Sequence, residues 1–521
     1  ASTGWGLGSW GGVQQGQFTS TLSSSINTSV TSLTMASSSA FASSGTVLIG
    51  TELITYTSNS SNTLSGLTRG AKGTTAASHS SGATVTDASN YVGWNAAASG
   101  DVITDPGIWS LDNFGNKLVA TIFNGESFEW DSDPITANST RATIIAGAPT
   151  ASRFSLISTP DRHVVFFGTE TTIGTKSTQD EMFIRFSSQE DINTYTPTST
   201  NTAGTQRLSD GSRIVGAIRG RDAIYVWTDT ALFVMKFVGP PFTFSFQQVG
   251  TNCGLIGKNA AVEVDGVAYW MSDNGFFRYS GKLESLPCLV EDFVYDDINL
   301  IPKQHINAGL NNLFGEVMWF YPNSGSGIVN KMVAYNYLDS SRERPVWTSG
   351  TLARTAWRDS AVFGKPHATE YNASATTATT DVNYVYGNTD GTSTYFEHET
   401  GLDQIKEGAT TAIAASIESG DFDIGNQGLQ GDGEFVMKIR RFVPDFLSQT
   451  GDAVVTLNLR NYSNDSQASS SLGPFTITSS TTKVDTRARA RAISLKVANT
   501  STGQFWKLGT FRLDIQPDGR R

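Results

Sequence analysis

Three arginines near the end of the sequence have the spacing that most clearly suggests a function. Arg487, Arg489 and Arg491 alternate with Ala488 and Ala490. Because successive side chains of a β-strand point to opposite faces, this spacing predicts a row of three cations on one face. Stacked cations repel one another unless they meet anions or open solvent. Two interpretations stay open: a docking face for acidic groups of a neighbouring subunit, or a solvated face whose arginines pair within the chain.

The other residue types that perform catalysis form no recognisable site. The chain has five histidines, and they are scattered. His398 lies in Glu397-His398-Glu399, which is either a metal or acid–base cluster or, as we expect, an exposed turn. No phosphate-binding loop, dinucleotide-binding glycine motif, zinc-protease motif or nucleophile elbow is present. We therefore expect no catalytic, cofactor-binding or metal-binding residues, and no enzymatic activity.

Two acidic motifs suggest sites but are better explained as turns. Ser272-Asp273-Asn274-Gly275 faintly resembles an Asp-box turn of sialidases, but it occurs once and without the full pattern. Such Asp/Asn-Gly sequences usually shape hairpins. Asp421, Asp423 and Gly425 begin like a calcium loop but lack its later Glu. We expect a turn at both places.

The composition indicates short strands joined by tight turns. Charged residues make up 16% of the 521 residues, against about 25% in an average domain. The chain has 51 glycines, and 11% of its residues are aromatic. So little charge excludes a coiled coil and a polyelectrolyte-like disordered chain. The chain is long enough for about three domains, or for one large repeat array with additions.

The net charge restricts the partners. The formal charge is −11 and the pI is near 5.0. An acidic chain does not grip nucleic acid by neutralising phosphates, although it can let DNA pass without adhering. Cys253 and Cys288 are the only cysteines, and we expect both to be reduced thiols. No apolar run is long enough to span a membrane, so we expect no membrane span.

Residues 17–88 are expected to form a small inserted β domain rich in Ser and Thr. Apolar residues recur through this stretch, and VLIGTELITYTS (47–58) predicts two short strands around Gly50. Gly-Trp phrases flank the stretch at 4–6 and 93–94, as expected for an insertion. Residues 1–16 would then join the main body. The alternative is a disordered Ser/Thr linker.

Residues 89–411 are expected to form a β-propeller of about six blades. From about residue 105, apolar and aromatic strands come in pairs, separated by polar turns, about every 50 residues. The clearest pairs lie at 117–131, 162–188, 222–239, 260–281, 315–339 and 379–401. Most tryptophans of this region fall at strand positions, where core packing is the expected role. The competing all-β arrangement is a set of sandwiches.

Residues 412–521 are expected to form a separate β-sandwich that serves as a platform domain. Val455, Leu457 and Leu459 alternate with Thr456 and Asn458. This period of two predicts a strand with one buried face. The predicted fold is therefore all-β throughout.

Several phrases resemble a family of known proteins. They include GWGLGSWG (4–11), WSLDNFGNKLVA (109–120), FIRFSSQED (183–191), NTAGTQRL (201–208), WTDTALFVMKFVG (227–239), YWMSDNGFFRYSG (269–281), EVMWFYP (316–322), RTAWRD (354–359) and FRLDIQPDGRR (511–521). Together they resemble the tail structural proteins of tailed bacteriophages, most closely the tail nozzle, or tail tubular protein B, of short-tailed phages. The resemblance covers about 89–521 and the first dozen residues. The phrase ITYTSNSSNTLSGLTRG…AASHSSGATV (54–85) is similar to a small module of many phage virion proteins.

The resemblance implies a structural role. Proteins of this family are homohexamers built around a β-propeller, placed below the adaptor under the portal, and they surround the DNA exit channel. Expected partners are other copies of the chain, the adaptor or head-to-tail connector, tail fibre or needle proteins, and genomic DNA passing without specific binding. The expected location is the virion tail, assembled in the host cytoplasm. Two alternatives stay open: another virion component, such as a hub or fibre-attachment protein, and a receptor-binding or glycan-cleaving tail protein.

Overall fold

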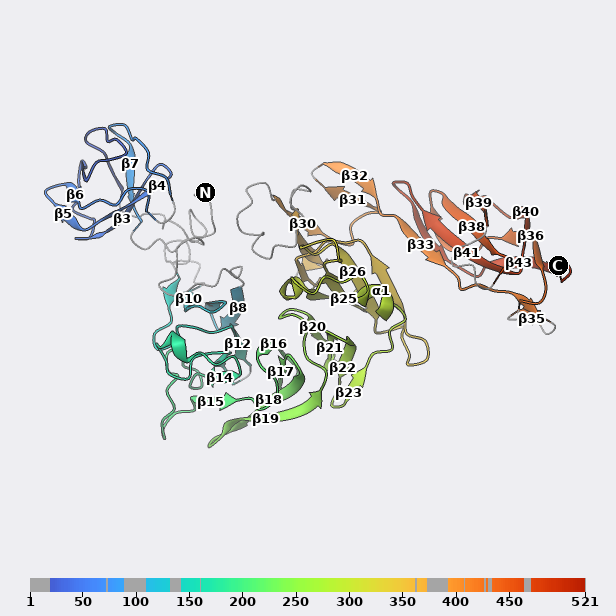
Figure 1. The fold of residues 1–521 in the computed structure, drawn as a ribbon, viewed down its shortest axis with the longest axis horizontal. Coiled ribbons are helices and arrows are strands. Elements are labelled where there is room, and N and C mark those ends of the chain that lie inside the picture. The colour runs from blue at the N-terminus through green and yellow to red at the C-terminus, as the bar shows by residue number, and fades with distance from the viewer. Residues whose placement is uncertain are drawn as a thin grey trace. The chain divides into compact units, whose positions relative to one another are not determined.

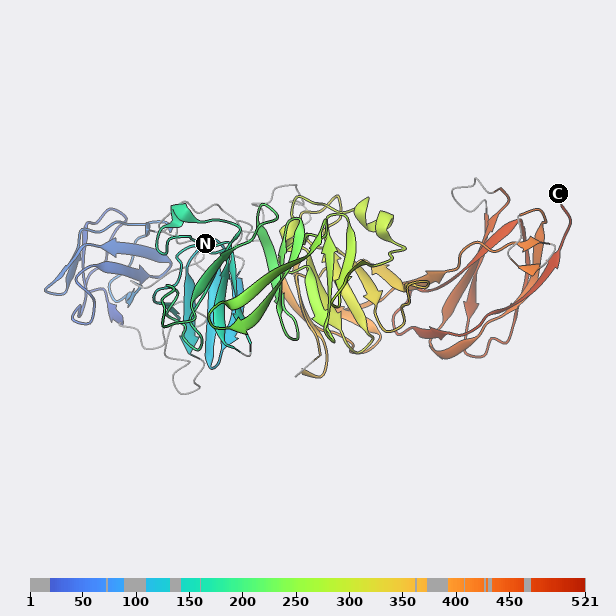
Figure 2. The same ribbon diagram turned by 90° about the horizontal axis from the view of Figure 1, so that it is seen from below.

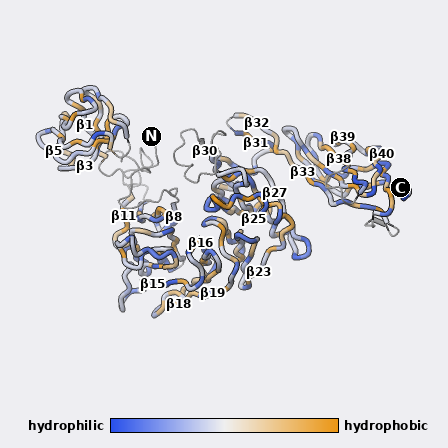
Figure 3. Tube along the Cα trace, viewed as in Figure 1, coloured by the Kyte–Doolittle hydropathy of each residue, from blue (hydrophilic) through white to orange (hydrophobic). Residues whose placement is uncertain are grey.

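The computed structural model describes residues 19–71, 74–88, 109–131, 142–159, 161–360, 363–372, 392–406, 408–425, 428–429, 433–462 and 470–520. Strands dominate these ranges, and helix is limited to α1 (Glu291–Tyr295) and short 3-10 turns such as η2 (Lys176–Thr178) and η3 (Lys303–His305). The chain divides into two compact units, Ala1–Phe396 and Glu397–Arg521. Hydrophilic and hydrophobic residues interleave along the strands, as expected for sheets with one buried face (Figure 3).

Residues 19–88 form two small sheets around a core of their own (Figure 1). One sheet has the order β1-β7-β3-β4 and the other β2-β6-β5. Their bounds are β1 (Thr19–Thr21), β2 (Ser32–Thr34), β3 (Gly45–Ile49), β4 (Glu52–Tyr56), β5 (Ser58–Ser60), β6 (Thr63–Ser65) and β7 (Thr84–Asp87). Leu22, Leu33 and Met35 of the Ser/Thr-rich stretch are buried in this core. The small β unit is confirmed, and the linker alternative is wrong. The expected role of residues 1–16 concerns residues outside the described ranges.

The described residues between 109 and 397 form six sheets that follow one another along the chain. The first consists of β8 (Trp109–Phe114), β9 (Lys117–Ile122), β10 (Ser127–Asp131) and β11 (Thr143–Ile144). The second consists of β12 (Phe154–Ser158), β13 (His163–Phe167), β14 (Phe183–Phe186) and β15 (Gly204–Arg207). The third consists of β16 (Ile214–Arg219), β17 (Ile224–Thr228), β18 (Ala231–Gly239) and β19 (Thr243–Thr251).

The last three sheets repeat this plan. The fourth consists of β20 (Ala261–Val264), β21 (Val267–Ser272), β22 (Gly275–Tyr279) and β23 (Leu283–Ser285). The fifth consists of β24 (Asn307–Asn311), β25 (Glu316–Tyr321), β26 (Lys331–Asn336) and β27 (Trp347–Gly350). The sixth has three described strands, β28 (Ala356–Arg358), β29 (His367–Asn372) and β30 (Thr392–Glu397).

These sheets are the blades of a β-propeller. In the first five sheets the four strands pair antiparallel in chain order, and the three strands of the sixth also follow chain order. The first strand of each sheet contacts the first strand of the next, from β8 through β12, β16, β20 and β24 to β28 (Figures 1 and 2). This arrangement of four-stranded meanders defines a propeller. The expected propeller of about six blades is confirmed, and the alternative of separate sandwiches is wrong for this region. Most of the expected pair at 379–401 lies outside the described residues.

Tryptophans hold three neighbouring blades together. Trp227, Trp270 and Trp319 occupy the second strands of the third, fourth and fifth sheets, and all three are fully buried. The rings of Trp227 and Trp270 lie 5.3 Å apart. The Trp270 indole donates a hydrogen bond to the Cys253 carbonyl and the Trp319 indole to the Ala260 carbonyl. The Trp270 and Trp319 rings are therefore anchored in the loop between the third and fourth sheets, whereas Trp227 is held by packing.

The C-terminal unit is a β-sandwich. One sheet has the order β33-β41-β38-β39 and the other β40-β36-β43. Their bounds are β33 (Ala415–Glu418), β41 (Ala492–Asn499), β38 (Ala453–Arg460), β39 (Ser470–Ile477), β40 (Val484–Ala490), β36 (Met437–Val443) and β43 (Arg512–Pro517). The small pairs are β31 (Asp403–Lys406) with β32 (Ala409–Ala412), β34 (Ile424–Gly425) with β35 (Gly428–Leu429), and β37 (Phe446–Thr450) with β42 (Phe505–Leu508).

The core of the sandwich lies between its two larger sheets. Met437 and Ile439 of β36 pack with Leu457 and Leu459 of β38 and Ile493 of β41. Burial alternates along β38 with the predicted period of two. The compact unit begins at Glu397, so it includes the β31–β32 hairpin, which the sequence pattern places with the propeller.

Candidate functional site

The predicted arginine row lies on β40, at one edge of the sheet β40-β36-β43. Ala488 and Ala490 are fully buried against the sandwich core, whereas Arg487 and Arg489 are exposed on the other side. Small alanines let β40 approach the opposite sheet, and the alternation leaves long cationic side chains on the solvent side. The structure thus places Arg487 and Arg489 on one outward face.

Arg491 does not share that face. Strand β40 ends at Ala490, and Arg491 lies in the bend before β41. Its half-buried guanidinium donates hydrogen bonds to the carbonyls of Gly433, Glu434 and Arg520, at 2.8 to 3.0 Å. Arg491 therefore joins the segment before β36 to the chain end after β43. It has a structural role and adds no free charge to the row.

Neighbouring strands extend the positive charge. In the register between β36 and β40, Lys438 lies opposite Arg489, and Arg441 lies opposite Asp485. A bulge between these positions leaves Arg440 exposed. Arg512 of β43 lies on the same side, because it is paired with Val443 two residues beyond Arg441. We call this outward surface the basic face, and its cations are Lys438, Arg440, Arg441, Arg487, Arg489 and Arg512. The same three strands hold two carboxylates, Asp485 and Asp514, so their formal net charge is +4.

Local ion pairs neutralise only part of the basic face. The Arg489 Nε lies 2.6 Å from Asp518 Oδ2, and the Arg441 Nε lies 3.2 Å from Asp485 Oδ1. All four side chains are at least 40% exposed, so water screens both pairs. Arg440, Arg487 and Arg512 form no ion pair with any residue in the described ranges. These three guanidinium groups can therefore meet carboxylates or phosphates of a partner.

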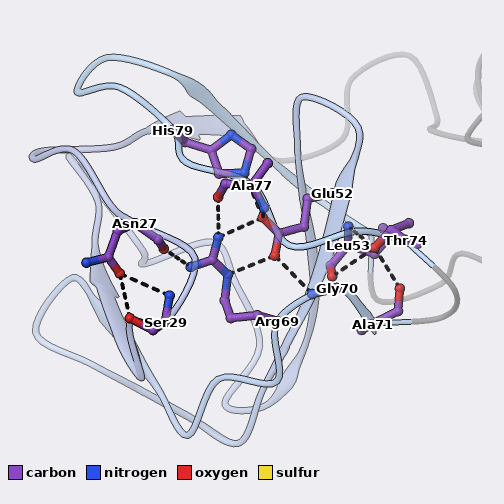
Figure 4. A network of polar contacts seen from close by, with 10 residues as sticks. All are labelled: Asn27, Ser29, Glu52, Leu53, Arg69, Gly70, Ala71, Thr74, Ala77 and His79. Carbon is purple, nitrogen blue, oxygen red and sulfur yellow. Dashed lines mark hydrogen bonds and ion pairs between the residues drawn. The ribbon is translucent and has the colours of Figure 1, made fainter.

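A very different charge cluster lies in the N-terminal β unit (Figure 4). The fully buried carboxylate of Glu52 accepts hydrogen bonds from Arg69 at 2.8 and 2.7 Å and from the backbone amides of Gly70 and Ala77 at 2.9 and 3.1 Å. His79 Nε2 lies 2.8 Å from the same carboxylate. Arg69 also donates to the carbonyls of Asn27 and Ala77.

The Glu52 cluster is closed and structural. Burial alone would raise the pKa of Glu52, but the hydrogen bonds from Arg69, Ala77, His79 and Gly70 outweigh burial and lower this pKa to about 2. A carboxylate with such a low pKa is a poor proton acceptor near neutral pH, and its oxygens are already occupied. The cluster ties Glu52 of β4 to Arg69, Gly70, Ala77 and His79, and the charges of Glu52 and Arg69 balance each other.

One hydrogen-bonded set has the order of a catalytic triad. Asp161 Oδ2 lies 2.9 Å from His163 Nδ1, and Thr202 Oγ1 lies 3.2 Å from His163 Nε2. His163 is fully buried, however, and packs within 6.2 Å of the rings of Phe186, Phe237 and Phe244. Hydrogen bonds from His163 and Ser158 lower the pKa of Asp161 despite its burial. Through Ser158 the set joins β12 to β13 and to the loop before β15, and its imidazole is closed to solvent.

A buried lysine and an open groove are two further polar features of the propeller. Burial lowers the pKa of Lys258 to about 8, and its ammonium group donates to Ser110 Oγ at 2.6 Å. This contact joins the loop before β20 to β8 of the first sheet. A groove of about 940 Å³ lies between the first and second sheets, and its charged lining includes Lys117, Arg162 and Glu190. Arg162 pairs with Glu190 at 3.0 Å, and Lys117 with Glu129 at 2.7 Å.

The first acidic motif forms a hairpin turn. Ser272 is paired with Gly275 across the two-residue hairpin between β21 and β22, and Asp273 contacts Lys303 at 3.1 Å. The expected turn at Asp421, Asp423 and Gly425 is wrong, because Phe422 forms a β-bridge with Ile493 and Ile424–Gly425 is the short strand β34. Asp421 pairs with Arg460 at 2.9 Å, ahead of the short strand β34. Glu397, His398 and Glu399 follow at the end of β30, where the C-terminal unit begins. Within the described ranges, no three His, Cys, Asp or Glu residues gather closely enough to hold a metal ion.

Sequence reasoning missed the Glu52 cluster and the Asp161–His163–Thr202 set. A signal existed for the first, because residues 1–100 hold only four charged residues, Glu52, Arg69, Lys72 and Asp87. Isolated charges in an apolar and hydroxyl-rich segment usually need a partner when they are buried. No comparable signal marked the second set, since Thr202 lies 39 residues from His163.

The comparisons with known proteins identify no family. No family model and no curated protein matches the chain. Among solved structures, Hsv2 of Kluyveromyces lactis is 10% identical, with a TM-score of 0.28, over 50% of this chain and 70% of that one. The dihydro-heme d1 dehydrogenase NirN is 11% identical, with a TM-score of 0.33, over 63% of this chain and 58% of that one. The AfRom2 CNH domain is 10% identical, with a TM-score of 0.33, over 62% of this chain and 92% of that one. Values this low carry no functional argument, so the assignment as a β-propeller rests on the arrangement of the six sheets themselves.

Proposed function

We propose that this chain is a structural protein of a bacteriophage tail and that six copies form the nozzle around the DNA exit channel. In this role the ring stands below the adaptor or head-to-tail connector and holds the channel closed until genome ejection. Tail fibre or needle proteins attach to it, and DNA passes without specific binding. The chain is then a virion component assembled in the host cytoplasm, and it is not an enzyme.

The distribution of charge is the observation that carries this proposal. The first unit holds 23 Lys and Arg against 33 Asp and Glu, a formal charge of −10, whereas the second holds 14 against 15. A duplex carries one negative charge per about 1.7 Å of its axis, so an acidic wall repels it. Such a wall suits a conduit through which DNA must slide.

The resemblance supports the same role, because its phrases fall on the framework of the propeller. WSLDNFGNKLVA (109–120) covers most of the β8–β9 hairpin, WTDTALFVMKFVG (227–239) leads from the end of β17 through β18, and YWMSDNGFFRYSG (269–281) spans most of the β21–β22 hairpin. The shared phrases therefore include strands that build the blades, beyond the exposed loops.

Exposed apolar side chains favour a protein that is covered by neighbours. Phe242, Leu289 and Leu338 are each more than two-thirds exposed on the first unit. Phe293, Leu313, Phe314 and Ile301 are each more than half exposed. Contiguous exposed apolar groups commonly mark protein–protein contacts.

The test is the symmetry of the assembled protein. The purified chain, alone and mixed with the adaptor of the same particle, is measured by native mass spectrometry and imaged by cryo-electron microscopy. A six-fold ring with an axial bore wide enough for duplex DNA supports the proposal. A three-fold spike on the particle, or a chain that stays monomeric in both samples, would overturn it.

A further inference from the structure

A second exposed segment differs from the basic face in both charge and apolar content. The α1 segment, residues 289–301, holds Glu291, Asp292, Asp296 and Asp297 and no Lys or Arg. The segment also holds large apolar side chains that reach solvent: Leu289, just before the acids, is 76% exposed, and Phe293, between them, is 53% exposed. Leu300 and Ile301 are exposed as well. The segment therefore combines negative charge with uncovered apolar surface.

The α1 segment is held firmly on the propeller. Val294, on the inner side of helix α1, is fully buried. The Tyr295 hydroxyl donates to the Ser272 carbonyl at 2.7 Å and accepts from the Gly275 amide at 3.1 Å, at the tip of the β21–β22 hairpin. Burial raises the pKa of Tyr295, so this hydroxyl stays protonated. A short segment fixed in this way presents its acids in a set arrangement, which lowers the entropic cost of binding.

We propose that the basic face of one copy docks on the α1 segment of a second copy. A head-to-tail contact that closes into a ring requires two different, complementary surfaces on one chain. The basic face supplies cations with long apolar stems, and the α1 segment supplies carboxylates together with Leu289 and Phe293. Guanidinium groups bind carboxylates in a bidentate manner and stack on aromatic rings, so arginine suits such a partner. The inference rests on the proposed homohexamer and names the contact that closes it.

A second copy fits the basic face better than nucleic acid does. The whole chain carries a formal charge of −11, which repels a polyanion at long range. A short acidic segment instead contacts only the three strands of the basic face, whose formal net charge is +4, and is therefore attracted. Charge complementarity of this kind sets the register of a contact and the rate of association.

Paired charge reversals test the contact. One variant carries Arg440→Glu and Arg487→Glu, two cations with no ion pair within the described ranges. The other carries Asp292→Lys and Asp296→Lys on the α1 segment. We expect each variant alone to associate about 100-fold more weakly than wild type, because every contact then opposes like charges. A matched control, Arg221→Glu with Lys236→Glu, reverses two exposed cations of the third sheet and should assemble as wild type does.

Mixing the two variants separates a contact between copies from one within a chain. In an equal mixture, the reversed basic face of one variant meets the reversed α1 segment of the other, and the remaining faces also match. An alternating ring with an even number of copies therefore forms again. Assembly could instead be restored only when both pairs of changes are placed in the same chain, and not in the mixture. That result would show an intramolecular contact and overturn the proposal.

The remaining outcomes are also decisive. Rings of normal stability from both variants would overturn this contact and leave the proposed nozzle intact. A wild-type chain that forms no homo-oligomer would overturn the nozzle and this contact together. Binding of a short DNA duplex that is lost with Arg440→Glu and Arg487→Glu, while the ring persists, would assign the basic face to nucleic acid instead. Circular dichroism of each variant checks that the fold is retained.

Discussion

The Glu52 cluster and the basic face use the same pair of chemical groups in opposite ways. In the N-terminal unit, Arg69 and Glu52 are 8% and 0% exposed, and His79 and the backbone occupy the remaining positions around them. On the sandwich, Arg489 and Asp518 are 53% and 40% exposed. A buried pair without competing water contributes to one folded structure, and its loss leaves an uncompensated charge. An exposed pair contributes little to stability, because water screens its charges.

Removing the charge of Glu52 should give the largest effect. With Glu52→Gln, Arg69 stays buried without its counter-ion, so we expect the N-terminal unit to lose about 3–5 kcal/mol of stability. Hydrogen exchange of the β3 and β4 amides measures this loss. Asp518→Asn is the matched control on the sandwich. Equal protection of β3 and β4 in the variant and the wild type would contradict a stabilising role for the cluster.

Acid should remove the same stabilisation without a mutation. The pKa of Glu52 lies at about 2 in the folded chain, below its ordinary value of 4.5. A lowered carboxyl pKa stabilises the fold fully above the ordinary value, and the contribution is lost as the pH falls toward the folded value. The difference in stability between wild type and Glu52→Gln should therefore be constant above about pH 5 and shrink between about pH 4.5 and 2. Urea unfolding across this range measures it, and a constant difference at all pH values would refute the assignment.

Removing the charge of Arg491 should destabilise the fold, but less than removing the charge of Glu52. The Arg491 guanidinium holds the carbonyls of Gly433, Glu434 and Arg520, so Arg491→Gln removes charge-assisted hydrogen bonds. We expect the sandwich to lose about 1–3 kcal/mol. Chemical unfolding of the full chain, followed by hydrogen exchange in β36 and β43, reports the loss. A variant as stable as wild type would show that these bonds are replaced by water at no cost.

Arg487 should give the smallest effect on folding. It is exposed and has no ion pair within the described ranges, so Arg487→Gln should change the stability by less than about 0.5 kcal/mol. The comparison with Arg491→Gln, two residues away, separates a structural arginine from an available one. A larger loss of stability in Arg487→Gln than in Arg491→Gln would reverse this distinction.

Local sequence patterns made the fold predictable. Contacts between residues distant in sequence could not be predicted. The blades follow from hairpins whose strands are aromatic or β-branched and whose turns hold Gly, Asn or Asp, as in the β21–β22 hairpin. The outward position of Arg487 and Arg489 followed from alternation alone. Alternation failed at Arg491, because β40 ends one residue earlier and the period of two has no meaning beyond a strand end. The partners of Glu52 stand 17 and 27 residues away in sequence, where no local pattern can predict them.

The chain order of the six sheets has a consequence for synthesis. Every blade is built from consecutive strands, so the strands of one sheet leave the ribosome together and need no later segment to pair. Contacts between residues close in sequence form quickly, and domains fold largely from the N-terminus during translation. The first strand of each finished blade then offers a surface to the first strand of the next. The propeller should therefore grow blade by blade on the nascent chain, so that strand edges are exposed for only a short time before they are covered.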